Sequence, residues 1–482
     1  MEIQDIIFRK VYILSNIEDL METLVDQGKH VSLSANSRFI LNLIRVFASQ
    51  MVVIGHGINF FEIGSNLKPP QMPYMQNIAV VTFFLISGFL ISNSAYEKRQ
   101  KENYLFKDFC FDRSVRIYTT LLPMLLIVVF LDLVIIYVFN DTFYQNAFKL
   151  DVFISNLFML QDSISLSSNF SDFSLLGNTS FGSARPLWTI PVEWWMYFIF
   201  GFILLHNTEA EAEDQKESSK NLKEKIISFI IFLASVLFLA IIALGPRKRI
   251  KILLLTTWII GYSFMLLINI RNKHRNYSFI RPILLFMIIL SFLFFELTNI
   301  IIIIFLVLIE VVGFFLYIFH VNSKSRLGII LVQLEIKIKN ILGNLIEKLS
   351  RKKKILFSFV LISIIGSTIR ILVTKVAYDP LFILLFSISF YFIILFFNSC
   401  SFKIPETIIK IFQFLSSYSF VLYIVHYSIF IVFLNLVDYI NISSTFLFFL
   451  AFIVINLISI LLSLITERKT GIFKKKLKSL FD

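Results

Sequence analysis

Long apolar stretches separated by short polar segments run through most of the chain, and they predict membrane-spanning helices. A helix needs about 20 apolar residues to cross a bilayer. Such stretches lie at about 41–61, 78–95, 117–139, 186–205, 226–244, 250–270, 282–297, 300–319, 355–376, 381–397, 418–436 and 445–466. The predicted fold is therefore an all-α, polytopic transmembrane bundle of about 10–12 spans.

The distribution of basic residues predicts the orientation of these spans. Lysine and arginine gather in alternate loops, and the positive-inside rule places such loops and both chain termini in the cytoplasm. One loop disagrees, because Arg247, Lys248, Arg249 and Lys251 would lie outside. Either the 226–270 region is not two clean crossings, or these charges face an anionic substrate.

Three segments outside the spans complete the predicted organisation. Residues 1–37 form an amphipathic N-terminal extension, and residues 38–466 form the transmembrane domain. Inside that domain, the basic amphipathic stretch 321–354 is expected to lie on the anionic inner leaflet, in contact with membrane lipids. Residues 467–482 form a lysine-rich cytoplasmic tail.

Composition supports a membrane protein and excludes several other classes. Of 482 residues, 57% are hydrophobic and only 16% are charged, which a soluble globular protein does not show. The net charge of +13 comes from the loops, so it does not indicate nucleic-acid binding. The two cysteines, Cys110 and Cys400, are far apart, and we expect neither a disulfide framework nor a metal site. No cleavable signal peptide is expected, because the first long apolar segment begins near Phe39.

The first span carries two ionisable residues, Arg45 and His56. An ionisable side chain at membrane depth is costly, and it marks a functional site by default. The two residues are 11 positions apart, so they share one helix face and lie about 16 Å apart along the axis. His426 is the other histidine well inside a span. The ordinary alternative for each histidine is a buried neutral ring that donates to a carbonyl.

Glu193 is the carboxylate that we expect near His56. Counted inward from Pro186, Glu193 lies in the outer part of its span, as His56 does in the first span. A carboxylate at the same height can orient the imidazole of a general base.

Arg113 and Arg116 form an R-x-x-R pair at the cytoplasmic start of the third span, and Arg45 could join them. Three guanidinium groups suit a phosphorylated ligand that arrives from the cytoplasm. Ordinary positive-inside anchoring is the alternative.

Other polar or aromatic residues of the spans have no assigned role at this point. Asp132, Glu310 and Arg370 have no obvious partner in the sequence. Trp188, Trp194 and Trp195 suit an interfacial aromatic belt, although they could also stack on a sugar.

Taken together, the motifs resemble the membrane acyltransferase family called acyltransferase 3. That family shows an Arg-x10-His, an FF-x-x-SGF segment, an R-x-x-R pair, a W-x-x-x-x-E segment and a late S-x-x-x-Y-x-x-H. In this chain they are Arg45 to His56, Phe83 to Phe89, Arg113 to Arg116, Trp188 to Glu193, and Ser419 through Tyr423 to His426. The chain departs from the family at Asn42, where the family has Asp, and at Ser416, where it has Gly.

The resemblance implies an enzyme that O-acylates a saccharide of the cell envelope. The donor would be acyl-CoA, such as acetyl-CoA, held by Arg45, Arg113 and Arg116. His56 would be the general base, with Glu193 as its orienting partner. Ser87, Trp188, Tyr423 and His426 would support the site, and no bound cofactor is implied. The acceptor would be an envelope polysaccharide or a lipid-linked saccharide at a bacterial cytoplasmic membrane.

Two other classes remain open from the sequence. A polysaccharide exporter or flippase also needs a polar membrane cavity, but it has no need of CoA. A non-catalytic subunit of a glycan synthase complex would tolerate the loss of His56.

Overall fold

The computed structural model describes residues 33–101, 104–165, 174–205, 218–269, 344, 352–439 and 442–481. Within these residues the chain is helical and forms no strand, and ten helices are long and apolar enough to cross a membrane. This confirms the predicted helical membrane fold. The ten helices match ten of the twelve predicted spans. The spans predicted at 282–297 and 300–319 lie outside the described residues, as do residues 1–32 and nearly all of the predicted segment 321–354.

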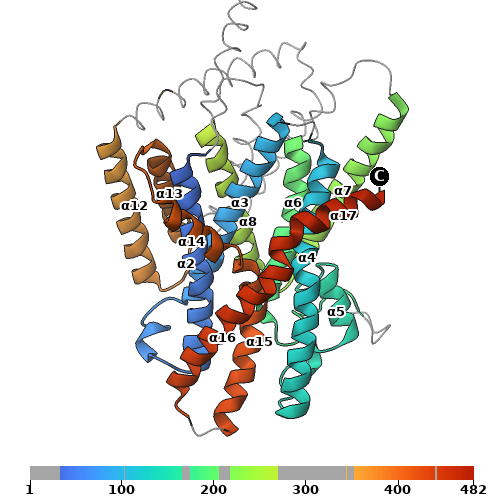
Figure 1. Ribbon diagram of the computed structural model, residues 1–482, viewed down its shortest axis with the longest axis vertical. Helices are drawn as coiled ribbons and strands as arrows, with labels where there is room; N and C mark the ends of the chain where they lie inside the picture. The colour runs from blue at the N-terminus through green and yellow to red at the C-terminus, as the bar shows by residue number, and fades with distance from the viewer. Residues whose placement is uncertain are drawn as a thin grey trace, which may run out of the picture. The chain divides into compact units, whose positions relative to one another are not determined.

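Figure 1 shows the described helices. In chain order they are α2 (Ala35–Phe60), α3 (Met75–Lys101), α4 (Phe106–Leu133), α5 (Leu150–Leu157), α6 (Ile190–Leu205), α7 (Ser218–Ala243), α8 (Lys248–Asn269), α12 (Lys353–Thr374), α13 (Pro380–Ser399), α14 (Glu406–Ser416), α15 (Ser419–Tyr439), α16 (Ser444–Ile465) and α17 (Thr470–Phe481). A π-helical turn, Val134–Val138, extends α4. The 3-10 turns in the described part of the chain are Ser65–Leu67, Gln145–Ala147, η4 (Arg185–Thr189) and η6 (Glu467–Lys469).

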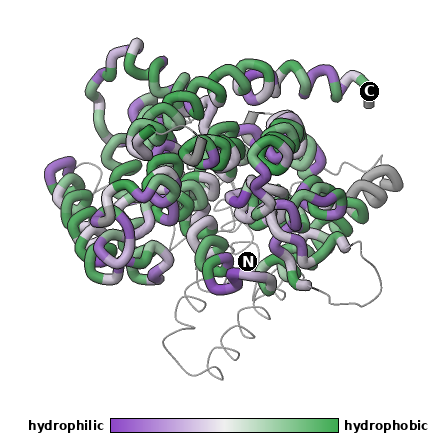
Figure 2. The backbone as a smooth tube through the Cα atoms, turned by 90° about the horizontal axis from the view of Figure 1, so that it is seen from below, coloured by the Kyte–Doolittle hydropathy of each residue, from purple (hydrophilic) through white to green (hydrophobic). Residues whose placement is uncertain are grey.

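Large apolar side chains on the helix surfaces support membrane insertion. On α4, Leu122, Leu126 and Phe130 recur every four residues and are 42%, 57% and 64% exposed. A soluble protein rarely exposes such a continuous apolar stripe, whereas lipid tails solvate it. Figure 2 shows that hydrophobic residues dominate the helices, with hydrophilic residues interspersed among them.

The chain forms two compact units. The smaller unit comprises 1–37, 263–360 and 392–401, and the larger one 38–262, 361–391 and 402–482. In the smaller unit, polar contacts join the start of α2 to the end of α13. The backbone N–H of Ser34 donates to Asn398 Oδ1 at 3.0 Å, and Asn36 Nδ2 donates to the Cys400 carbonyl at 3.0 Å.

The larger unit contains every residue that the sequence predicted for the site. Its centre is made by α4, α6 and α15, because α15 packs against both α4 and α16, while α6 packs against α3, α4 and α7. Met124 and Leu125 of α4 and Val425 of α15 are completely buried there. In Figure 1, α15 and α16 run side by side and α17 crosses α4.

Helices α3 and α8 approach each other closely at two glycines. A Cβ atom on Gly88 would lie 1.9 Å from the Trp258 carbonyl oxygen, and one on Gly261 would lie 2.2 Å from the Leu85 carbonyl oxygen. Small residues permit such close backbone packing between membrane helices. The glycine of the FF-x-x-SGF segment therefore sets the position of α3, and with it that of the preceding Ser87.

We expect Gly88→Ala to destabilise the protein, because the new methyl group must push the α8 backbone away. Overpacking of this kind costs about 1–3 kcal/mol or more. Gly366→Ala on α12 is the matched control, since its Cβ would meet only Leu385 Cδ1 at 4.0 Å. Thermal unfolding of the purified variants in detergent measures the difference. Equal melting temperatures for the two variants would contradict the close α3–α8 contact.

Candidate functional site

Two imidazole rings meet between α2 and α15. The ring centres of His56 and His426 are 5.3 Å apart, and Tyr427 stands 5.2 Å from His56. His426 is completely buried, and its Nδ1 lies 2.9 Å from the Leu422 carbonyl oxygen. A carbonyl only accepts, so Nδ1 carries the proton and Nε2 keeps its lone pair. Among the described residues, Nε2 has no hydrogen-bond partner.

Nδ1 of His426 thus donates to a carbonyl, as is usual for a buried histidine, whereas Nε2 has no such partner in the described residues. Its second nitrogen is a buried acceptor beside His56. A buried polar atom without a partner costs free energy, and it indicates that a ligand group or water completes the site.

Tyr423 ties this pair to the start of α6. Its hydroxyl donates to the Pro186 carbonyl at 2.9 Å and lies 2.7 Å from Thr189 Oγ1, while its ring stands 6.2 Å from that of His426. Trp188, from the same 3-10 turn η4, lies 4.8 Å below the guanidinium carbon of Arg247. Four of the predicted residues, His56, His426, Tyr423 and Trp188, thus belong to connected elements.

Glu193 is bound by a polar side chain of α3 and by one of its own helix. It accepts a hydrogen bond from Ser87 and another from Tyr197, whose hydroxyl lies 3.3 Å from Ser87 Oγ. Its electrostatic neighbours include Arg116 and Arg45. Among the described contacts, none joins Glu193 to His56.

Tyr423 is a further electrostatic neighbour of Glu193, and the Tyr423 ring stands 6.2 Å from that of His426. Glu193 thus has electrostatic neighbours in both the arginine cluster and the imidazole cluster. The orienting role of Glu193 toward His56 stays a prediction.

The three predicted arginines do come together. Arg45, Arg113 and Arg116 are connected by electrostatic interactions, with Arg116 next to both of the others. Arg113 is only 6% exposed, its guanidinium lies 5.3 Å from the Phe109 ring centre, and its Nε has no hydrogen-bond partner in the described residues. Arg116 is exposed and Arg45 is half-buried. The cluster thus combines a buried donor with a solvent-accessible one.

Asp112, which precedes Arg113, is bound by three polar side chains. It forms ion pairs with Lys98 and, at 2.5 Å, with Lys474 of α17, and it accepts a hydrogen bond from the Tyr104 hydroxyl at 2.9 Å. Burial and the neighbouring Asp112 charge raise the pKa of Tyr104, so its phenol stays protonated and donates. Because the two lysines balance the charge of Asp112, the adjacent Arg113 can bind another anion.

Glu467 is a site residue that the sequence prediction missed. It lies in η6, and its electrostatic neighbours are Arg116 and Arg45. It begins the lysine-rich segment that was predicted to be a simple tail. The available signal was a single carboxylate at the very end of the last apolar run.

Two residues of the basic loop that departs from the positive-inside rule belong to an internal ion-pair network. Helices α7 and α8 on either side of this loop are two separate candidate spans. Asp162 pairs with Lys251 at 2.8 Å and with Arg247 at 3.0 Å, and the Lys251 side chain is completely buried. These two charges are therefore compensated by the protein itself.

Two of the unassigned charges also find structural partners. Asp132 accepts the backbone N–H of Ser183 at 3.1 Å, beside Gly182, whose positive φ of 50° and missing side chain make room for the carboxylate. Arg370 forms two 2.8 Å hydrogen bonds with Asp379. Glu310 lies outside the described residues.

Two of the departures from the family pattern, Asn42 and Ser416, contact each other. Ser416 Oγ lies 3.3 Å from Asn42 Oδ1 and donates to it. An Asp would bring a charge to this position and a Gly would leave the amide without its donor. The hydrogen bond between Ser416 and Asn42 therefore takes the place of the family's Asp and Gly. Asn42 lies on the helix that carries Arg45.

Comparison with known proteins places the chain in a family. Residues 38–467 match the family model described as an acyltransferase domain, of the Acyl_transf_3 family. An O-acetyl transferase of Shigella phage Sf6 is 29% identical over 174 residues, which are 35% of this chain and 46% of that protein. The chain thus matches about half the length of this relative. No solved structure matches significantly.

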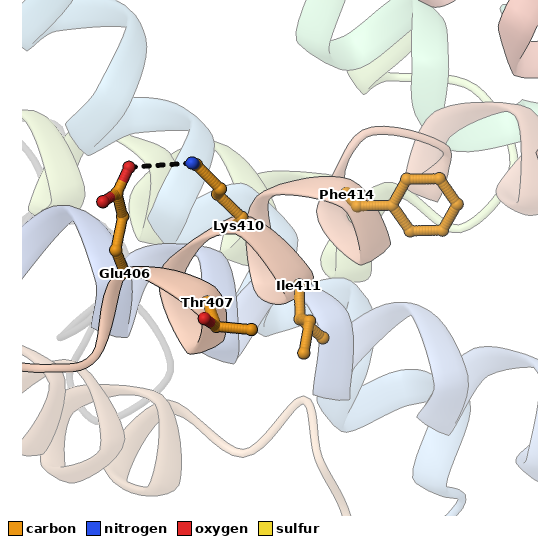
Figure 3. Close-up of a pocket in the computed structure, with 5 residues that line it drawn as sticks. All are labelled: Glu406, Thr407, Lys410, Ile411 and Phe414. Atoms are coloured by element: carbon orange, nitrogen blue, oxygen red, sulfur yellow. Dashed lines mark ion pairs between the residues drawn. The ribbon is translucent and has the colours of Figure 1, made fainter.

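We expect Asp162→Asn to destabilise the protein strongly, because it leaves the buried Lys251 ammonium without a counter-charge. Breaking a buried pair by removing one partner costs about 3–5 kcal/mol. Glu406→Gln is the matched control. Glu406 pairs with Lys410 at 2.8 Å on the exposed face of α14 (Figure 3), and such exposed pairs contribute about 0.3–0.5 kcal/mol. Similar melting temperatures for both variants would show that Asp162 does not neutralise Lys251.

Proposed function

The chain belongs to the acyltransferase 3 family of membrane O-acyltransferases, and from this premise we propose its donor, acceptor and catalytic base. The donor is acyl-CoA, with acetyl as the acyl group, bound from the cytoplasm. The acceptor is a hydroxyl of an envelope polysaccharide or lipid-linked saccharide. The membrane is the bacterial cytoplasmic membrane, and both termini of the chain face the cytoplasm.

The observation that carries this proposal is the arrangement of two polar clusters along α2. Arg45 joins the arginine cluster and His56 joins the imidazole pair, about 16 Å further along the same helix. Acyl-CoA has the same two-ended form, because an extended pantetheine arm separates its phosphates from the thioester. The arginines would hold the phosphates while the thioester reaches the imidazoles.

His56 is proposed to act as the general base. It takes the proton of the acceptor hydroxyl while the hydroxyl oxygen attacks the thioester carbonyl carbon. The carbon–sulfur bond then breaks, the ester forms, and the departing CoA thiolate receives the proton from His56. The unpartnered Nε2 of His426 offers an acceptor beside this base, where a second hydroxyl of the saccharide can donate to it.

Glu193 is assigned to the donor end. Its contacts with Ser87 and Tyr197, and its proximity to Arg45 and Arg116, make it a counter-charge for the arginines. A guanidinium at membrane depth needs such a partner. Glu193 would therefore position the donor-binding arginines, while His56 relies on His426 and Tyr427 for its environment.

We expect His56→Gln to remove most acyl transfer, since glutamine keeps polarity but cannot take a proton. General-base assistance is worth about 10²–10⁴-fold in rate. The assay is release of CoA from acetyl-CoA, with transfer of label to an envelope-saccharide fraction, by purified protein. Gln50→Ala is the control, because Gln50 lies on the same helix but donates to Asn456 at 2.8 Å. Near-normal turnover of a folded His56→Gln protein would contradict the role.

The same assay separates the other functional classes. An exporter or a non-catalytic subunit would consume no thioester in wild-type form.

The double variant Arg113→Ala/Arg116→Ala is expected to bind CoA at least tenfold more weakly. Each hydrogen bond to a charged group contributes about 1.5–3 kcal/mol, and 1.4 kcal/mol is a factor of ten in affinity. Isothermal titration with CoA measures the loss. Lys352→Ala/Lys354→Ala removes two exposed charges elsewhere and serves as the control. Unchanged CoA affinity in the folded arginine variant would place the phosphates elsewhere.

A further inference from the structure

The carboxylate of Glu467 occupies a place where positive charge converges. Glu467 belongs to η6, which packs against α4, the helix of Arg113 and Arg116. Its electrostatic neighbours are Arg116 and Arg45, and it accepts a hydrogen bond from the backbone N–H of Val421. Its Oε2 is buried and has no hydrogen-bond partner among the described residues.

Val421 adds a second kind of anion-binding group to the arginines. It is the third residue of α15, which spans Ser419–Tyr439. The first N–H groups of a helix have no partner within the helix, and this end carries a partial positive charge. Helix N-termini bind phosphate for this reason. Two guanidinium groups and a helix N-terminus therefore face one carboxylate.

A carboxylate satisfies this arrangement only in part. It carries one negative charge and two oxygens, whereas a phosphate group carries more charge and three acceptor oxygens. The unpartnered Oε2 of Glu467 agrees with incomplete satisfaction. The two arginines and the N-terminus of α15 therefore fit a phosphate better than they fit the Glu467 carboxylate.

We infer that Glu467 is a displaceable stand-in for a phosphate group of the acyl donor. This inference rests on the proposed binding of acyl-CoA at the arginines. When the donor binds, its phosphate takes over Arg45, Arg116 and the N-terminus of α15, and the Glu467 carboxylate moves aside. The C-terminal segment then becomes a plug that competes with the donor.

Two contacts near Glu467 can be released, while Lys474 further along the segment stays paired with Asp112. Arg468 bonds Ser417 Oγ at 2.9 Å on the exposed surface, and Thr470 Oγ1 lies 3.2 Å from Thr119 Oγ1. Along α17, Ile472 and Leu480 are 65% and 73% exposed, between lysines. In Figure 2, the helix that ends at the C label alternates between hydrophilic and hydrophobic residues, as expected for a helix on a membrane surface.

The alternative is that Glu467 is a permanent counter-charge that orients the arginines. The two roles predict opposite effects of removing its charge. A competing carboxylate weakens donor binding in the wild type, so its loss strengthens binding. A permanent counter-charge prepares the arginines, so its loss weakens binding or leaves it unchanged.

The test is titration of full-length purified Glu467→Gln with CoA, beside wild type and the control Glu406→Gln. We expect Glu467→Gln to bind CoA at least tenfold more tightly and Glu406→Gln to match wild type. Equal or weaker CoA binding by Glu467→Gln overturns the inference. Should this variant not fold, Glu467→Asp keeps the charge but shortens its reach. It should also bind CoA more tightly than wild type, and unchanged or weaker binding overturns the inference equally.

The arginine double variant separates this inference from the proposed function. If Arg113→Ala/Arg116→Ala leaves CoA binding unchanged, the donor site itself is misplaced. If that variant loses affinity while Glu467→Gln gains none, the donor site stands and the stand-in role falls.

Discussion

The charge of Arg45 within the first span is the constraint on which the site depends. A guanidinium at membrane depth must be compensated, and here carboxylates come from two other elements, Glu193 of α6 and Glu467 of η6. Both carboxylates act electrostatically on Arg45. The regular rise of α2 places His56 about 16 Å further along the helix, where His426 of α15 stands.

The two ends of α2 thus belong to two polar clusters of different chemistry. The arginine end gathers groups that bind anions, including a helix N-terminus. The imidazole end gathers groups that accept and hold protons, beside the aromatic and cationic residues Trp188 and Arg247. Close packing at Gly88 keeps Ser87 in contact with Glu193, so even the glycine of the third motif serves the charge balance at the arginine end.

The spans were predictable because each needs only a local property, a run of about 20 apolar residues. The arginine cluster was also predictable, since helical spacing places Arg113 and Arg116 on one face. Partners from distant parts of the chain were not. Asp162 neutralises Lys251 from a loop 89 positions away, and no pattern near either residue shows it.

The partner of Glu193 was not predictable either, because Ser87 lies 106 positions away on α3. Glu467 was overlooked because a carboxylate among lysines is ordinary on a solvated tail. Only its packing against α4 and the start of α15 gives it a role.

The sidedness of the reaction tests this account most directly. Sealed membrane vesicles of defined orientation would receive labelled acetyl-CoA on one face only, with transfer to saccharide measured afterwards. The account predicts transfer when acetyl-CoA meets the face that carries the C-terminal segment, and none when it meets the opposite face. Transfer only from the opposite face, or equal transfer from both, would contradict a donor site built from Arg45, Arg113 and Arg116.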